Sequence, residues 1–203
     1  MPSPEGAPRV ALGCAEVSVP RHPSVRIAVS GSHRCGKSTL VADLAESLEG
    51  YRTVEEPYRL LEEEGHAFAD PPSLEDFLAQ LRRSLELLEE DAAPDLLLDR
   101  CPADLLAYLL THEEAEAFDV EEWLPRIRSA FGALDVVVHV PIEQPDRIPL
   151  TDGENEALRC AVDQKLTWIL LDDPFDLQIE VVTVEGSRRS RVKSVLESLR
   201  GRR

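Results

Sequence analysis

The sequence predicts an α/β fold in which a parallel β-sheet is covered by helices on both faces. Short apolar runs rich in branched side chains alternate with longer segments whose apolar residues recur at helical spacing. Such alternation produces a parallel sheet, because each helix returns the chain to the edge where the next strand starts. The length of 203 residues suits one domain with its own core. We expect a three-layer αβα sandwich around five parallel strands.

Five short segments carry the strand pattern. They are residues 25–30, 51–54, 95–98, 136–140 and 179–184. Pro57 follows the second segment and biases Glu56 toward extended backbone, so that strand ends there. In sheets of this kind ligands bind at the carboxyl ends of the strands, which is where the motifs described below fall.

Helical spacing follows each strand segment. The predicted helices cover residues 40–48, 58–64, 74–88, the segment that begins at 102, and then 120–133, 154–171 and 188–199. Ser73 caps the third of these, with Asp76 in the capping-box position three residues later. Pro102 suits the first turn of the helix after the third strand.

Composition bounds the class of protein. Residues 1–23 carry five prolines and little periodicity, which indicates a flexible leader ahead of a domain over residues 24–203. No segment has the length and apolarity of a membrane span or of a signal-peptide core, which predicts a cytoplasmic protein. The four cysteines lack paired zinc spacing, so reduced thiols are expected.

Charge argues against two kinds of partner. The net charge is −17, and a field of that sign repels polynucleotides and anionic membranes. Basic residues gather near the C-terminus, where they could contact a phosphate or a partner; we favour the interpretation that they are the solvated face of the last helix and a frayed tail. They are Arg188, Arg189, Arg191, Lys193, Arg200, Arg202 and Arg203.

The first functional motif follows the first strand. Residues 31–39 match G-x-x-x-x-G-K-S, the phosphate-binding loop signature, and predict nucleotide triphosphate as ligand. Gly31 and Gly36 let the backbone curl so that several N–H groups converge. Lys37 supplies an ammonium for the β- and γ-phosphates, and the Ser38 hydroxyl can hold Mg²⁺. The candidate nucleotide-binding residues are Gly31, Ser32, His33, Arg34, Cys35, Gly36, Lys37, Ser38 and Thr39.

Carboxylates end two further strands. Asp99 follows an apolar strand in the Walker-B arrangement, which orients Mg²⁺ directly or through water. Arg100 beside it can clamp a transferring phosphoryl group or a substrate oxygen. Glu55 and Glu56 precede Pro57, and since neighbouring strand residues face opposite ways, one of the two can point at the phosphoryl centre. A carboxylate there can take the proton from an attacking hydroxyl.

In these motifs the chain resembles small P-loop kinases of the nucleoside and nucleotide kinase group. It looks closest to the branch of nicotinamide riboside kinase-like and deoxynucleoside kinase-like proteins, with an AAA-type ATP-binding domain. The matching elements are Gly31 to Ser38, Glu56-Pro57, Asp99-Arg100 and Val184 to Ser187. These elements are distributed over residues 25–199. The loop is highly specific for nucleotides, whereas the two short pairs are moderately specific.

The resemblance implies roles for these residues. Glu56 corresponds to the base that activates a sugar hydroxyl, and Asp99 with Arg100 to the pair that holds metal and phosphates. Those kinases usually have Glu in place of Asp99, although thymidylate kinases have Asp. The loop containing Gly186 and Ser187 corresponds to the one that touches adenine.

The resemblance also implies a basic lid that closes over ATP after the fourth strand. The corresponding residues 141–165 contain only Arg147, Arg159 and Lys165 among acids, so the lid is sparse. Arg147 or Arg159 is the candidate lid arginine.

The leading interpretation is therefore a kinase that uses Mg²⁺ and ATP to phosphorylate a small, nucleoside-like acceptor. It would bind neither nucleic acid nor membrane and act as a monomer or a homodimer. The sparse lid favours an alternative, a regulatory ATP-binding module that hydrolyses ATP slowly. A GTP switch ranks last, because the sequence lacks an Asn-Lys-x-Asp or Thr-Lys-x-Asp guanine motif.

Overall fold

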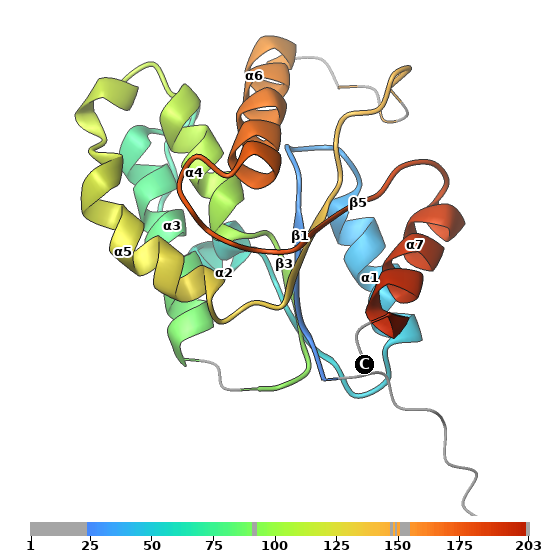
Figure 1. The fold of residues 1–203 in the computed structure, drawn as a ribbon. Helices are drawn as coiled ribbons and strands as arrows, with labels where there is room; N and C mark the ends of the chain where they lie inside the picture. Colours follow the sequence, from blue (N-terminus) through green and yellow to red (C-terminus); the bar gives the residue numbers. More distant parts are fainter. Residues whose placement is uncertain (1–23, 91–92, 147, 149, 151–154, 202–203) are drawn as a thin grey trace, which may run out of the picture.

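The computed structural model describes residues 24–90, 93–146, 148, 150 and 155–201 of the chain (Figure 1). The predicted leader, residues 1–23, lies outside the described residues. Within them the chain forms a five-stranded sheet with the order β2-β3-β1-β4-β5, and every adjacent pair of strands is parallel. The predicted α/β class, the number of strands and their parallel arrangement are confirmed.

The central strand is the one that leads into the phosphate-binding loop. β1 pairs with β3 on one side and with β4 on the other, so that Val29 lies opposite Asp99 and Val138. The strands are β1 (Arg26–Ser30), β2 (Arg52–Val54), β3 (Leu96–Asp99), β4 (Val136–His139) and β5 (Val181–Thr183). This register brings the carboxyl ends of β1 and β3 to one level of the sheet edge.

Helices cover both faces of the sheet. One face carries α1 and α7, which pack against each other, and the other carries α3, α4, α5 and α6 (Figure 1). The helices are α1 (Lys37–Ser47), α2 (Pro57–Glu63), α3 (Leu74–Glu90), α4 (Pro102–Thr111), α5 (Val120–Phe131), α6 (Glu156–Thr167) and α7 (Arg188–Arg200). A short 3-10 helix covers Ala115–Ala117. Among the described residues, no helix combines the length and apolarity needed to cross a bilayer.

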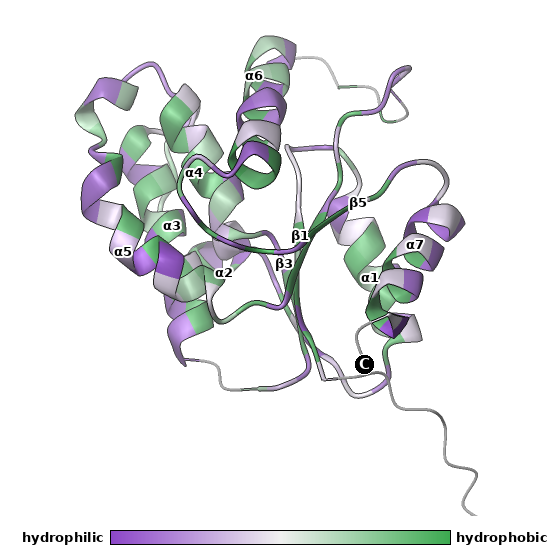
Figure 2. Cartoon of the chain, in the orientation of Figure 1, coloured by the Kyte–Doolittle hydropathy of each residue, from purple (hydrophilic) through white to green (hydrophobic). Residues whose placement is uncertain are grey.

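The strands divide two apolar cores because their side chains alternate. Ile27 and Val29 pack with α1 and α7, whereas Ala28 packs with the larger cluster under α3 to α6. Figure 2 shows green and purple side by side on α3 and α5, as expected for helices that bury one face and solvate the other.

The last third of the chain differs most from the predicted boundaries. The α-helical part of α6 ends at Thr167, and the chain continues as a π-helical turn over Trp168–Asp172 rather than as one helix. Asp173 then takes a left-handed backbone, and its carboxylate accepts the amides of Leu177 and Gln178. β5 is shorter than the predicted segment 179–184, and it is an edge strand that pairs only with β4.

The predicted capping box at the start of α3 is present. The Ser73 hydroxyl accepts the Asp76 amide at 3.2 Å, and the Asp76 carboxylate accepts the Ser73 amide at 2.8 Å. The same carboxylate also bonds to the His66 ring and the Ala69 amide. Burial by itself would raise the pKa of Asp76, but these hydrogen bonds outweigh it and hold that pKa at about 2.

Asp76→Asn is expected to lower the free energy of unfolding at pH 7 by about 1–2 kcal/mol, because the ionised form makes the stronger hydrogen bonds. The folded pKa lies below the unfolded value, so this stability is present above about pH 4 and is lost as the pH falls toward 2. Urea unfolding of both proteins between pH 7 and 3 measures the difference. Glu75→Gln, on the exposed side of the same turn, is the control. A difference that does not shrink with falling pH would contradict this origin.

Candidate functional site

The predicted site residues gather at one edge of the sheet, where β1, β2 and β3 end. The loop after β1 leads into the amino end of α1 (Figure 1). Asp99 is the last residue of β3 and Arg100 follows it, and Glu56 comes shortly after β2. The neighbouring loops after β4 and β5 reach the same edge. The topology therefore brings together residues that are far apart in the sequence.

The two loop glycines are required for different reasons. Gly36 has φ +92° and precedes α1, in a region of backbone space that favours glycine. Gly31 is needed for close approach, because a Cβ there would lie 2.4 Å from the Val140 carbonyl oxygen and 2.6 Å from Cys35 Sγ. The predicted curl of the loop thus depends on the positive φ angle that Gly36 adopts and on the absence of a Cβ at Gly31.

Lys37 is buried and contacts its own loop. Its Nζ donates to the Ser32 carbonyl oxygen at 2.7 Å, and the side chain is 5 % exposed. The Cys35 thiol donates to the same oxygen at 3.1 Å, and burial raises the pKa of that thiol. The His33 ring lies 3.0 Å from the Tyr108 hydroxyl, while the Arg34 side chain is exposed.

Asp99 and Ser38 form the predicted metal position. Burial raises the pKa of Asp99, whereas a hydrogen bond with Ser38 and the Lys37 charge act in the opposite direction. The Asp99 Oδ1 atom is buried and has no hydrogen-bond partner among the described residues. An unpartnered carboxylate oxygen beside a hydroxyl fits Mg²⁺, which prefers oxygen ligands and draws the rest from water and phosphates. The described residues contain no cluster of three or more His, Cys, Asp or Glu that could hold a metal by themselves.

Arg100 connects three acidic or aromatic neighbours of the site. Its Nε donates to Glu56 Oε2 at 2.9 Å, its Nη1 lies 3.9 Å from Asp104 Oδ1, and its guanidinium lies 5.7 Å from the Tyr108 ring centroid. Arg100 also has φ +89°, an unusual backbone conformation for a residue with a side chain. Its backbone N–H donates a hydrogen bond to the Val29 carbonyl oxygen, which stabilises this conformation. Strained residues of this kind gather at functional sites.

Glu56 rather than Glu55 meets this arginine. Glu56 is partly buried, and although its burial favours the neutral form, the charge and hydrogen bond of Arg100 lower its pKa overall. Glu55 is exposed. Of the two neighbouring carboxylates, Glu56 is therefore the one that contacts Arg100.

Arg159 lies on the outer side of the phosphate-binding loop. It is 2 % exposed, and it donates to the carbonyl oxygens of His33 at 3.0 Å and Arg34 at 2.9 Å while pairing with Asp146. The candidate lid arginine thus contacts the loop directly. The other candidate, Arg147, lies outside the described residues.

A cavity of about 360 Å³ adjoins the start of α1. It reaches from Gly36 and Thr39 to the turn of Gly186 and Ser187, which is the turn predicted to meet adenine. Gly186 has φ +90°, and the Ser187 hydroxyl accepts the Ser190 amide and caps α7.

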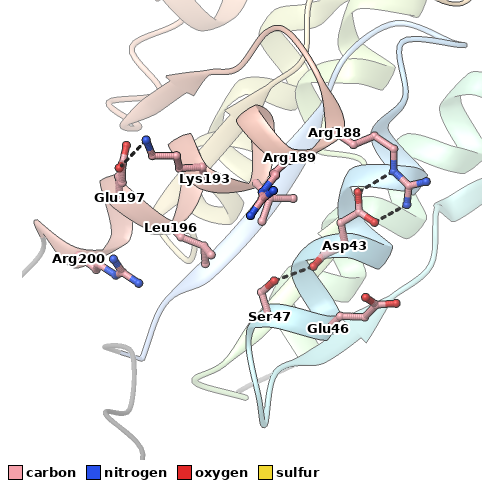
Figure 3. Close-up of a pocket in the computed structure, with 10 residues that line it drawn as sticks. Asp43, Glu46, Ser47, Arg188, Arg189, Lys193, Leu196, Glu197 and Arg200 are labelled. Atoms are coloured by element: carbon pink, nitrogen blue, oxygen red, sulfur yellow. Dashed lines mark hydrogen bonds and ion pairs between the residues drawn. The ribbon is translucent and has the colours of Figure 1, made fainter.

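A shallower groove of about 550 Å³ continues from that cavity between α1 and α7 (Figure 3). At its end nearest the cavity, Arg188 makes a two-bond ion pair with Asp43, with N···O distances of 3.0 and 2.5 Å. Arg189, Lys193 and Arg200 are exposed on α7, as the solvated-face interpretation predicts. Arg202 and Arg203 lie outside the described residues.

Arg191 departs from that interpretation. It is 8 % exposed, donates to the Cys35 carbonyl at 2.8 Å and pairs with Glu143 at 2.7 Å. The apolar residues of α7, Val195 and Leu199, recur at helical spacing after Arg191 and place it on the buried face. Periodicity alone could have located it there.

Sequence reasoning also missed Asp104, which is fully buried below the loop. Its carboxylate accepts the Ser30 hydroxyl at 2.8 Å, the Gly31 amide at 2.9 Å and the Cys101 amide at 3.0 Å. The last bond forms a capping box at the start of α4. The spacing of three residues from Cys101 to Asp104 was the available signal, and it was obscured because Cys is not a usual cap.

Comparisons with known proteins agree with this geometry. A family model described as AAA domain matches residues 26–191, which is most of the chain. None of the curated proteins is significantly similar to this sequence.

Several solved structures share the fold at low identity. Thymidylate kinase from Candida albicans is 18 % identical, with a TM-score of 0.58 over 89 % of this chain and 92 % of that one. Deoxyadenosine kinase from M. mycoides with bound dATP is 14 % identical, with a TM-score of 0.53 over 86 % and 99 % of the chains. The NadR protein in complex with NAD and AMP-PNP is 23 % identical, with a TM-score of 0.62; the match covers 87 % of this chain and 50 % of that one.

The loop between β1 and α1, the parallel sheet order and the family match agree with one another, and the expected resemblance is confirmed at the level of family and fold. This chain belongs to the AAA domain family, and its P-loop αβα fold is shared with nucleoside and nucleotide kinases.

Proposed function

We propose that the chain is an ATP-dependent kinase that transfers the γ-phosphoryl group of Mg-ATP to a hydroxyl of a nucleoside-like small acceptor. The observation that carries this proposal is the Glu56–Arg100 pair, with its 2.9 Å hydrogen bond, beside Asp99 and the phosphate-binding loop. A loop with a metal carboxylate supports nucleotide binding alone. A partly buried carboxylate held toward the same edge adds a group that can accept a proton.

The proposed mechanism assigns one task to each side chain. The loop amides and Lys37 bind and orient the phosphates, and Asp99 and Ser38 would hold Mg²⁺, which would supply positive charge to the phosphate oxygens. Glu56 accepts the proton of the attacking hydroxyl. Arg100 keeps Glu56 ionised and faces the transferring group.

The acceptor class is proposed from aromatic residues on the Glu56 side of the site. Tyr108 lies next to Arg100 and His33 and stacks on Phe77 at a centroid distance of 4.9 Å. Tyr58 stacks on Phe68 at 4.3 Å. Tyr108 and Phe77 are buried in the core, so the aromatic faces that a planar base could reach are those of the partly buried Tyr58 and Phe68. The thymidylate and deoxyadenosine kinases that share the fold are consistent with such an acceptor.

A second function retains support from the segment after β4. The arginine available in the described part of that segment, Arg159, is engaged with loop carbonyls and Asp146. A protein without a mobile basic lid would transfer phosphoryl groups slowly, as a regulatory ATPase does. The deciding experiment measures ADP release with Mg-ATP against a panel of nucleosides, nucleotides and other small alcohols. Stimulation by an acceptor supports the kinase, and a uniform slow rate with every acceptor supports the regulatory ATPase.

Lys37→Ala is expected to weaken Mg-ATP binding by about 10–100-fold, because a buried ammonium that bonds charged oxygens is lost. The affinity is measured by titration calorimetry, with the exposed Lys193→Ala as the control. Unchanged affinity in Lys37→Ala would contradict the assignment of the loop.

A further inference from the structure

Cationic donors bond the backbone carbonyls of the phosphate-binding loop. Lys37 bonds the Ser32 carbonyl, Arg159 bonds the carbonyls of His33 and Arg34, and Arg191 bonds that of Cys35. Four successive carbonyl oxygens therefore each accept a hydrogen bond from a charged group. Two of the donors come from α6 and α7, more than 120 residues along the chain.

This arrangement fixes the direction of the loop amides. A peptide group is planar and trans, so its C=O and its N–H point in opposite directions. Arg191 bonds the Cys35 carbonyl at 2.8 Å and so determines where the Gly36 N–H points. Loop amides that converge on one centre are what a phosphate-binding loop uses to cradle its ligand.

The position of Arg191 is itself closely specified. A Cβ on Gly36 would lie 3.0 Å from Arg191 Nη1, so the guanidinium packs directly against the loop backbone. Glu143 Oε1 accepts both Arg191 Nη2 at 2.7 Å and the Gly186 amide at 2.6 Å. The Glu143 carboxylate, in the segment after β4, thus bonds both Arg191 of α7 and the turn predicted to meet adenine.

Stability alone gives a weak reason for such a pair. Arg191 and Glu143 have side chains only 9 % and 10 % exposed, and the desolvation of two charges offsets much of their attraction. The Arg191 Nε also remains buried without a partner among the described residues. An apolar pair of similar volume would stabilise the fold about as well, but it could not hold the Cys35 carbonyl.

We propose that Arg191 is a positioning residue for the phosphate-binding loop, held in place by Glu143 and acting through the Cys35 carbonyl. This inference deepens the proposed function and rests on it in taking the loop as the site for the ATP phosphates. It predicts that Arg191 contributes to the binding of any polyphosphate, with or without a base.

The test compares Mg-ATP with Mg-tripolyphosphate, which has the phosphates and lacks the base. Arg191→Met should weaken the binding of both ligands by a similar factor, about tenfold or more. Arg191→Lys keeps a positive charge beside Glu143, but a single ammonium cannot bond Glu143 and the Cys35 carbonyl as the two guanidinium nitrogens do. This variant should therefore weaken the binding of Mg-ATP and Mg-tripolyphosphate to a smaller extent. Arg189→Met, exposed on the same helix, should leave both affinities unchanged. Thermal unfolding of each variant is measured in parallel.

The outcomes separate the possible roles of Arg191. Weakened ATP binding with unchanged tripolyphosphate binding would make Arg191 a wall of the neighbouring cavity and overturn the proposal. A lower melting temperature with both affinities unchanged would make it structural and also overturn the proposal. If Arg191→Met does not fold, the same comparison with Arg191→Lys decides. Failure of the kinase proposal would instead appear as a wild type that binds tripolyphosphate but releases no ADP in response to any acceptor.

Discussion

Glu56→Gln is expected to lower acceptor-dependent ADP release by about 10²–10⁴-fold while Mg-ATP affinity stays within a few fold of the wild type. Glutamine has nearly the same shape, but its amide cannot take a proton from the attacking hydroxyl. Glu56 lies on the Arg100 side of the site, with its Oε2 2.9 Å from Arg100 Nε. Loss of rate with retained affinity is therefore the signature of a base.

The matched control is Glu55→Gln, because Glu55 is the adjacent carboxylate and is exposed. Initial rates of ADP release at saturating Mg-ATP and acceptor measure the chemical step, and calorimetry measures ATP affinity. Loss of rate in Glu55→Gln with normal rate in Glu56→Gln would exchange the two assignments. Equal rates in both variants would remove the carboxylate base from the mechanism.

The pH dependence gives a second measure of Glu56. Arg100 lowers the pKa of Glu56 below its ordinary value of 4.5, against the opposing effect of burial. Glu56 is then ionised at neutral pH, and protonation should remove activity only below about pH 4.5. An acid limb well above that value would assign the loss of rate to another group, such as Asp99, whose pKa is raised by burial.

The features that sequence predicted correctly are those encoded locally. β1, β3 and β4 are short, largely apolar runs, the loop is a contiguous motif, and the Ser73–Asp76 box has a fixed spacing of three residues. Periodicity and turn chemistry operate over a few residues, so they are readable before any tertiary contact is known. Because the strands are all parallel, their carboxyl ends meet at one edge of the sheet, and the functional residues that follow them gather at that edge.

The features that sequence missed depend on contacts between distant residues. The Arg191–Cys35 bond joins positions 156 residues apart, and the Asp104–Gly31 bond joins positions 73 residues apart. Helical periodicity can place a charged residue such as Arg191 on the buried face of its helix, but it does not say which loop carbonyl that residue will bond. A basic cluster was therefore interpreted by its average property, as a solvated face, although one of its members is enclosed by the fold.

Asp104→Ala is expected to lower the free energy of unfolding by about 3–5 kcal/mol, a large share of the roughly 5–15 kcal/mol of an ordinary domain. Asp104 is 0 % exposed, and its removal leaves the Gly31 amide, the Ser30 hydroxyl and the Arg100 charge without this acceptor. A buried charge that loses its partner costs more than the pair contributes, because the desolvation remains uncompensated. Urea unfolding at pH 7 measures the loss, with the exposed Asp172→Ala as the control.

The consequence for the loop is separable from the loss of stability. Asp104 accepts the Gly31 amide at 2.9 Å and so fixes the first residue of the loop, while its Oδ1 lies 3.9 Å from Arg100 Nη1. Asp104→Asn keeps an oxygen acceptor of the same size, and it should recover part of the stability while leaving Glu56 as the carboxylate that pairs with Arg100. A double-mutant cycle with Arg100→Met isolates the Arg100 charge: the two substitutions together should cost less than the sum of their separate losses. Strict additivity would mean that Asp104 acts on the loop backbone alone, and that Arg100 is held at the site by Glu56.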